Sequence, residues 1–265
     1  MNFEFKKNYR IDDLLTIMKI LRGENGCPWD KEQTHQSIRR NFIEETYEVA
    51  EAIDTEDVQL LQEELGDVLL QVVFHTQMEE ERGSFSFDDV CDGICKKLIL
   101  RHPHIFGDVK ADTAEEVLKN WDEIKKQEKG QKTQSDAVLS VPKTLPALMR
   151  AAKVQQRAAK TGFDYSELSD AMCDLDSELV ELKEAVTQGK QENIDEEFGD
   201  LLFSCVNISR FLHLDAEESL TRSIEKFIRR FKEVEKLANE RSVNMKTSSL
   251  EELNELWVEA KRSVQ

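Results

Sequence analysis

Eight acidic residues of this sequence form two groups with identical spacing, and carboxylates grouped in this way can bind a metal ion. The groups are Glu45, Glu48, Glu64 and Asp67, and then Glu178, Glu181, Glu197 and Asp200. Each residue of the second group lies 133 positions after its counterpart in the first. Both groups read E-x-x-E and then E-x-x-D, and residues three apart on a helix share a face. We expect each group to bring four carboxylates together where two antiparallel helices pack.

A hard divalent cation is the simplest partner for such a group. Four unpaired carboxylates repel one another, and the second acid pair of each group lies among apolar residues, where an unsatisfied charge is costly. An all-oxygen set of ligands favours magnesium, with manganese as the alternative, over iron or zinc. A di-iron bundle needs Glu-x-x-His on two helices, and no histidine occupies those positions. The competing interpretation is a solvated acidic helix face, since 54 residues are acidic.

Two further pairs of residues recur in both halves at the i, i+4 spacing of one helix face. Lys226 and Arg230 correspond to Lys97 and Arg101, while Trp257 and Lys261 correspond to Trp121 and Lys125. Beside a carboxylate–metal site, a lysine and an arginine on one face suit phosphate oxygens. A tryptophan can stack on a base. Surface charge and helix–helix packing are the alternatives for these pairs.

The pattern that positions these residues predicts an all-α fold made of two tandem repeats of a carboxylate-bearing helical bundle. Apolar residues recur at helical spacing, and only 4 Pro and 10 Gly interrupt the chain. We expect a first domain over 1–129, a polar linker over 130–143 and a second domain over 144–265. The expected helices cover about 11–22, 34–53, 57–83, 87–101, 113–128, 144–160, 216–240 and 249–262, and two more carry 178–186 and 196–207.

Composition limits the classes of partner. The formal net charge is −18, which disfavours nucleic acid and anionic membranes because both need a basic surface. A small polyphosphate held by local lysines and a metal stays compatible with that charge. The most apolar stretch, 68–74, is too short to span a bilayer, and residues 1–10 do not resemble a signal peptide. Five cysteines without a C-x-x-C motif predict reduced thiols and a cytoplasmic location.

Several segments together resemble the MazG family of nucleoside triphosphate pyrophosphohydrolases. They are GCPWDKEQT at 26–34, EETYE at 44–48, EELGD at 63–67, the RRF-EV segment at 229–234 and the late tryptophan. The similarity covers almost the whole chain, including its tandem arrangement. It implies an all-α, magnesium-dependent homodimer in which the second half carries the activity. One departure is Ser177, which stands where the first half has Glu44.

The resemblance also implies roles for residues of the second half. Glu178, Glu181, Glu197 and Asp200 correspond to metal ligands, Lys226 and Arg230 to phosphate contacts, and Trp257 and Lys261 to nucleotide contacts. The expected reaction is metal-assisted attack of water at the α-phosphorus, giving nucleoside monophosphate and pyrophosphate with broad base tolerance. Glu178 is the candidate for the proton acceptor. The alternatives are a pyrophosphatase with narrow specificity for one nucleotide and a non-enzymatic helical scaffold that binds structural cations.

Overall fold

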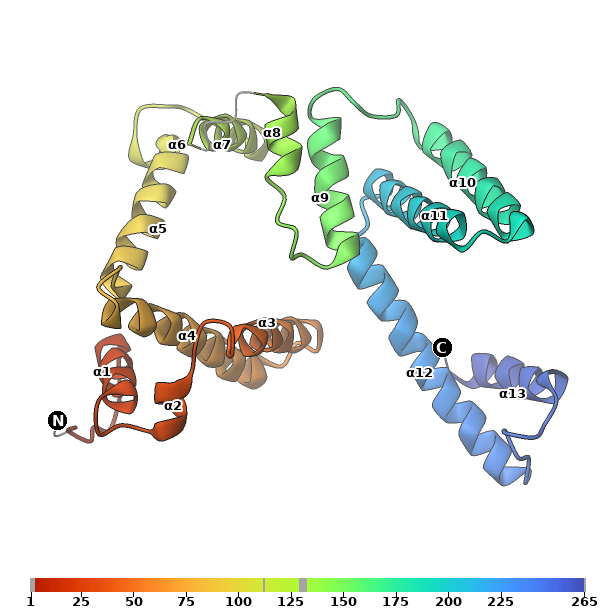
Figure 1. Ribbon diagram of the computed structural model, residues 1–265, viewed down its shortest axis with the longest axis horizontal. Helices are drawn as coiled ribbons and strands as arrows, with labels where there is room; N and C mark the ends of the chain where they lie inside the picture. Colours follow the sequence, from red (N-terminus) through yellow and green to blue (C-terminus); the bar gives the residue numbers. More distant parts are fainter. Residues whose placement is uncertain (1–2, 112, 129–132, 265) are drawn as a thin grey trace. The chain divides into compact units, whose positions relative to one another are not determined.

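The computed structural model describes residues 3–111, 113–128 and 133–264, and all regular structure in these ranges is helical (Figure 1). The all-α prediction is confirmed. The chain divides into two compact units, Met1–Lys125 and Lys126–Gln265, which we call unit 1 and unit 2. No helix in the described ranges is both long enough and apolar enough to cross a membrane.

Unit 1 is built around a hairpin of two long helices. α3 (Arg39–Asp54) packs along α4 (Val58–Glu81), and α1 (Ile11–Arg22) packs on the other part of α4, with α2 (Pro28–Glu32) against α1. α5 (Phe87–Arg101) follows α4 and contacts the short α6 (Pro103–Phe106). The apolar core joins α1 to the second half of α4 through Met18, Ile38, Val73, Phe74 and Met78. The acids at 45–67 therefore lie on the hairpin, beside this core.

Side-chain caps explain where the helices of unit 1 begin. Asp57 accepts hydrogen bonds from the amides of Gln59 and Leu60, at 3.0 Å each, and so starts α4. A capping box of Thr113 and Glu116 starts α7 (Ala114–Glu128), with both reciprocal bonds at 3.3 Å. The helix predicted from residue 34 begins instead at Arg39, because 34–37 form a turn closed by the side chains of Thr34 and Ser37.

Unit 2 repeats the hairpin. α10 (Leu168–Gln188) and α11 (Gln191–Phe211) pack together, joined at Gly189, whose φ of 72° lies in the left-handed region that glycine adopts without strain. α9 (Ala147–Ala159) packs on α11. α12 (Ala216–Glu240) and α13 (Leu250–Ser263) form a second pair, with a core of Val234, Leu237, Ala238, Leu256 and Ala260.

The predicted linker contains a short helix. α8 (Gln134–Leu139) begins with a capping box formed by Thr133 and Asp136 and packs on α9. Arg157 on α9 donates to the carbonyl oxygen of Ala137 at 2.5 Å, which ties the two helices together. Residues 129–132 lie outside the described ranges. The domain boundaries at 129 and 144 therefore stay predictions, although part of 130–143 belongs to the packed structure of unit 2.

Candidate active site

Three of the four predicted acids of unit 2 converge on one point of the α10–α11 hairpin. Glu178 on α10 meets Glu197 and Asp200 on α11, with one carboxylate oxygen of each within 4.8 Å of the others. Glu181 lies outside this group, and its Oε1 accepts a hydrogen bond of 2.9 Å from Ser177. We call the group of three the unit 2 acidic cluster. Glu197 and Asp200 are three residues apart on α11 and face Glu178 on α10, as the helical spacing predicted.

The electrostatics of this cluster are unfavourable without a cation. Burial raises the pKa of Glu178, and the charges of Glu181, Asp174, Asp200 and Glu197 raise it further. Burial also raises the pKa of Glu197, followed by the charges of its acidic neighbours. Carboxylates that resist ionisation together become favourable when a hard divalent cation neutralises them. The donor set, all carboxylate oxygen, fits magnesium or manganese.

Unit 1 has a matching acidic cluster. Glu45 and Glu48 on α3 and Glu64 on α4 place one oxygen each within 4.8 Å of the others. Asp67 lies outside this group, but its charge helps to raise the pKa of Glu45 and Glu64 after the larger effect of burial. Each half therefore brings together three of its four predicted ligands. The acid outside the group is Asp67 in unit 1 and Glu181 in unit 2, and these two residues do not occupy corresponding positions.

The four predicted substrate contacts lie on the other helix pair of unit 2. Lys226 and Arg230 are on α12, while Trp257 and Lys261 are on α13. The Lys261 ammonium lies 5.9 Å from the centroid of the Trp257 ring, which also contacts Phe227 at 5.1 Å between centroids. The Arg230 Nε is buried and has no hydrogen-bond partner among the described residues. We call these four residues the basic–aromatic cluster.

The chain does not gather the acidic and basic–aromatic clusters into one helix pair. α10 packs mainly on α11, whereas α12 packs mainly on α13 and also on α9. In unit 1, the Arg101 guanidinium lies 5.9 Å from the Trp121 ring centroid, so a cation–aromatic contact is present there too, but its cation does not correspond to Lys261 of unit 2. The side chain of Lys125 lies outside the described residues.

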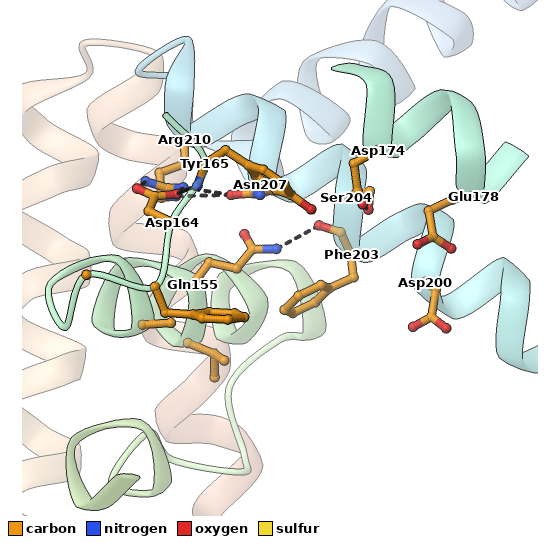
Figure 2. Close-up of a pocket in the computed structure, with 14 residues that line it drawn as sticks. Gln155, Asp164, Tyr165, Asp174, Glu178, Asp200, Phe203, Ser204, Asn207 and Arg210 are labelled. Atoms are coloured by element: carbon orange, nitrogen blue, oxygen red, sulfur yellow. Dashed lines mark hydrogen bonds and ion pairs between the residues drawn. The ribbon is translucent and has the colours of Figure 1, made fainter. Parts of the chain in front are cut away.

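A cavity of about 480 Å³ adjoins the unit 2 acidic cluster (Figure 2). α9, the loop after it, α10 and α11 line the cavity, and Glu178 and Asp200 belong to its wall. Sequence reasoning missed most of the polar lining residues: Gln155, Tyr165, Asp174, Ser204, Asn207 and Arg210. The volume is in the range typical of small-molecule sites.

Hydrogen bonds fix most of the polar groups in this wall. Arg210 forms an ion pair with Asp164, with Nη1 at 2.8 Å from Oδ2, and also donates to Asn207 Oδ1 from Nη2 at 2.9 Å. Asp164 therefore anchors the loop to α11 through Arg210. Ser204 Oγ donates to Asp174 at 2.7 Å, and the hydrogen bond from Tyr165 to Asp174 raises the pKa of that tyrosine to about 12.

The corresponding helix face of unit 1 ends in an apolar residue, Phe74. At the positions 133 residues earlier, unit 1 has Leu70 in place of Phe203, Gln71 in place of Ser204 and Phe74 in place of Asn207. Phe74 is only 5% exposed and belongs to the core of unit 1, with the Arg22 guanidinium 5.3 Å from its ring centroid. A comparison of the two repeats could have revealed these cavity residues, because polar residues of unit 2 stand at positions where unit 1 has different side chains.

Comparison with known proteins agrees with the tandem arrangement. The family profile described as the MazG nucleotide pyrophosphohydrolase domain matches residues 33–106 and 166–235. Both acidic clusters, Lys226 and Arg230 fall inside these matches, while Trp257 and Lys261 lie beyond them.

Relatives extend the similarity over nearly the full chain. A nucleoside triphosphate pyrophosphohydrolase of Escherichia coli (strain K12) is 47% identical over 258 residues, which covers 96% of this chain and 97% of the relative. The nucleoside triphosphate pyrophosphohydrolase/pyrophosphatase MazG of Thermotoga maritima is 44% identical over 250 residues, with coverage of 94% and 95%. An uncharacterized Bacillus subtilis protein, YabN, is 49% identical over 249 residues but only 51% of it is covered. This chain belongs to the MazG family.

The acidic cluster predicts an unusual effect of Glu178→Gln on stability. The folded-state pKa values of Glu178 and Glu197 are raised above their ordinary value of 4.5, so in chelator the free energy of unfolding falls as pH rises through and above that value. Glu178→Gln should therefore raise the melting temperature at neutral pH in chelator. Magnesium should stabilise the wild type more than the variant, because only the wild type keeps all its ligands.

Thermal melts at two pH values, with chelator and with magnesium, measure both effects. Glu184→Gln removes one charge from the same helix outside the cluster and serves as the matched control. A lower melting temperature for Glu178→Gln in chelator, or an equal gain from magnesium in both proteins, would contradict the assignment of Glu178.

Proposed function

We propose that unit 2 of this MazG-family chain hydrolyses nucleoside triphosphates to nucleoside monophosphate and pyrophosphate, with magnesium and with broad tolerance of the base. One observation carries the proposal: Glu178, Glu197 and Asp200 converge beside a cavity large enough for a nucleoside, inside a segment matched by the family profile. The activity named for the E. coli and T. maritima relatives supports it.

The acidic cluster holds the cation in this proposal. When bound, magnesium would neutralise charge on the triphosphate and would lower the pKa of a bound water. Glu178, Glu197, Asp200 and Glu181 would provide its carboxylate ligands. In unit 1 the same role falls to Glu45, Glu48, Glu64 and Asp67. Manganese fits the same donors.

The chain's own groups carry the remaining steps. A water oxygen bonds to the α-phosphorus as the bond from that phosphorus to the bridging oxygen of pyrophosphate breaks. Glu178 takes the proton of the attacking water through the carboxylate oxygen that does not bind the cation. Lys226 and Arg230 donate to phosphate oxygens and offset the charge on the departing pyrophosphate. Trp257 and Lys261 contact the nucleotide.

A second copy of the chain completes the site. α12 exposes an apolar stripe of Leu220, Ile224, Phe227 and Phe231, each between 46% and 54% exposed. Phe198 and Leu202 are exposed on α11, at 52% and 42%. Uncovered apolar faces of this kind mark interaction surfaces. In a homodimer, α12 of one copy brings Lys226 and Arg230 to the acids of the other.

A cytoplasmic location stays a prediction from the cysteines.

The cavity gives a specific reason to keep narrow nucleotide specificity as the second candidate. Its polar groups are held in fixed orientations by hydrogen bonds, which is how sites discriminate between ligands. Assays of pyrophosphate release from a panel of ribo- and deoxyribonucleoside triphosphates separate broad from narrow specificity. Magnesium-dependent release that chelator abolishes separates either enzyme from a cation-binding scaffold.

The two acidic clusters should contribute unequally to activity. Glu197→Gln should lower pyrophosphate release on the order of 100-fold or more, because it removes a ligand of the charge that stabilises the transition state. Glu64→Gln, the same change in unit 1, should leave most activity, because Phe74 occupies the position of Asn207 there. Both variants are compared at saturating magnesium after their folding is checked by circular dichroism. The reverse ranking refutes the assignment to unit 2, and equal partial losses mean two working sites per chain.

Lys226 and Arg230 should matter for the triphosphate and not for the cation. Each change to alanine removes a charge-assisted hydrogen bond worth about 1.5–3 kcal/mol, so kcat/KM should fall roughly 10- to 150-fold. Magnesium binding, followed by titration calorimetry, should stay at the wild-type level. Lys232→Ala, an exposed lysine of α12, is the control. Unchanged kinetics in both variants would mean that the pair is surface charge.

Mixed dimers test whether the second copy supplies these residues. A dimer of one Glu197→Gln chain and one Arg230→Ala chain contains one intact site if acids and arginine come from different copies. It contains none if both come from the same chain. Each variant should have strongly reduced activity as a homodimer, so a clear gain in pyrophosphate release from the co-purified mixed dimer decides between the two arrangements.

A further inference from the structure

The cavity of unit 2 starts at the acidic cluster and extends away from it along α11. Glu178 and Asp200 form one part of its wall, and Gln155, Asn207 and Arg210 form another (Figure 2). On the proposed function, a triphosphate lies at the acids. The nucleoside attached to that triphosphate is then the part of the substrate that reaches the rest of the cavity.

Gln155 has an unused acceptor at this wall. The side chain is only 7% exposed, and its Nε2 donates to the carbonyl oxygen of Phe203 at 2.8 Å. This bond fixes which way the amide points, because the Phe203 carbonyl belongs to α11. Oε1 has no hydrogen-bond partner within the described part of the chain. Figure 2 shows the amide nitrogen directed at Phe203 and the oxygen turned to the other side. A buried acceptor left without a donor is costly, and a ligand can supply the missing donor.

Asn207 is also held in one orientation. Its Oδ1 accepts hydrogen bonds from Arg210, at 3.2 Å from Nε and 2.9 Å from Nη2. Arg210 is in turn fixed by its ion pair with Asp164. With its oxygen committed to the guanidinium, Asn207 has its Nδ2 amide group left to donate. The wall thus combines a fixed acceptor from α9 with a fixed donor group on α11.

The same wall carries an aromatic ring that core packing does not use. Phe163 lines the cavity and is 83% exposed. An exposed ring beside paired polar groups suits a flat heterocycle, which stacks on the ring and forms hydrogen bonds at its edge.

We propose that this cavity is the nucleoside subsite and that Gln155 Oε1 accepts a hydrogen bond from an N–H group on the edge of the base, such as the 6-amino group of adenine. The inference rests on the proposed function and adds a residue that contacts the base. Every nucleobase carries an N–H group on its edge, so this contact agrees with broad tolerance of the base, and Gln155 takes no part in the chemical step. Unit 1 has Phe74 in place of Asn207 and so lacks one of the two polar groups.

The test removes the hydrogen bond once from the ligand and once from the protein. Purine riboside triphosphate is ATP without the 6-amino group, and Gln155→Met keeps the side-chain length but removes the acceptor. For the wild type, kcat/KM should be roughly 5- to 100-fold lower with purine riboside triphosphate than with ATP. For Gln155→Met, the two substrates should be handled alike, because the acceptor is already gone. The loss should appear mainly in KM.

Gln156→Met is the matched control, since it makes the same change at the next, exposed position of α9 and should keep the preference for ATP. Equal kcat/KM for the two substrates in the wild type overturns the inference, and this result needs no variant to fold. A preference that survives in Gln155→Met also overturns it. If the wild type releases no pyrophosphate from either substrate in magnesium, the proposed function itself has failed.

Discussion

Repulsion between carboxylates is the constraint around which both halves of this chain are built. Each helix hairpin brings three acids within 4.8 Å of one another, although burial and mutual charge already raise the pKa of members of each cluster. Such a cluster weakens the apo protein, and its presence in both repeats is compatible with a metal site in each. The short connections between the paired helices, at 55–57 and at Gly189–Lys190, hold the two sides of each cluster together.

Duplication preserved the acids but not their surroundings. Along α11 the residues Asp200, Ser204 and Asn207 continue one polar face, whereas the same face of α4 passes from Asp67 through Gln71 to Phe74. A single apolar residue at that point joins the face to the core of unit 1. The two halves can therefore share cation chemistry while only unit 2 carries both polar groups of the proposed nucleoside subsite.

The sequence predicted the helices and the acids well, because both follow from spacing along a single helix. α12 begins and ends at the predicted residues, 216 and 240, and α5 begins and ends at the predicted residues 87 and 101. Spacing could not show that Glu181 and Asp67 lie outside the groups of three, since that depends on how two helices pack. It also could not find Gln155 or Arg210, whose importance comes from contacts with Phe203 and Asp164, 48 and 46 residues away. Long-range contacts of this kind leave no periodic signal.

The rigidity of α11 links the two parts of the proposed site. A helix rises about 1.5 Å per residue, so Asp200 and Asn207 are separated by roughly 10 Å along the axis. That separation places the acids and the amides at different points along one helix, which suits a substrate held at the acids by phosphate and at the amides by base. Because one helix carries both groups, the distance between them cannot relax independently of the fold. The ion pair of Arg210 with Asp164 extends the same helix's control to the loop that carries Phe163, so the stacking ring and the amide donor are positioned together.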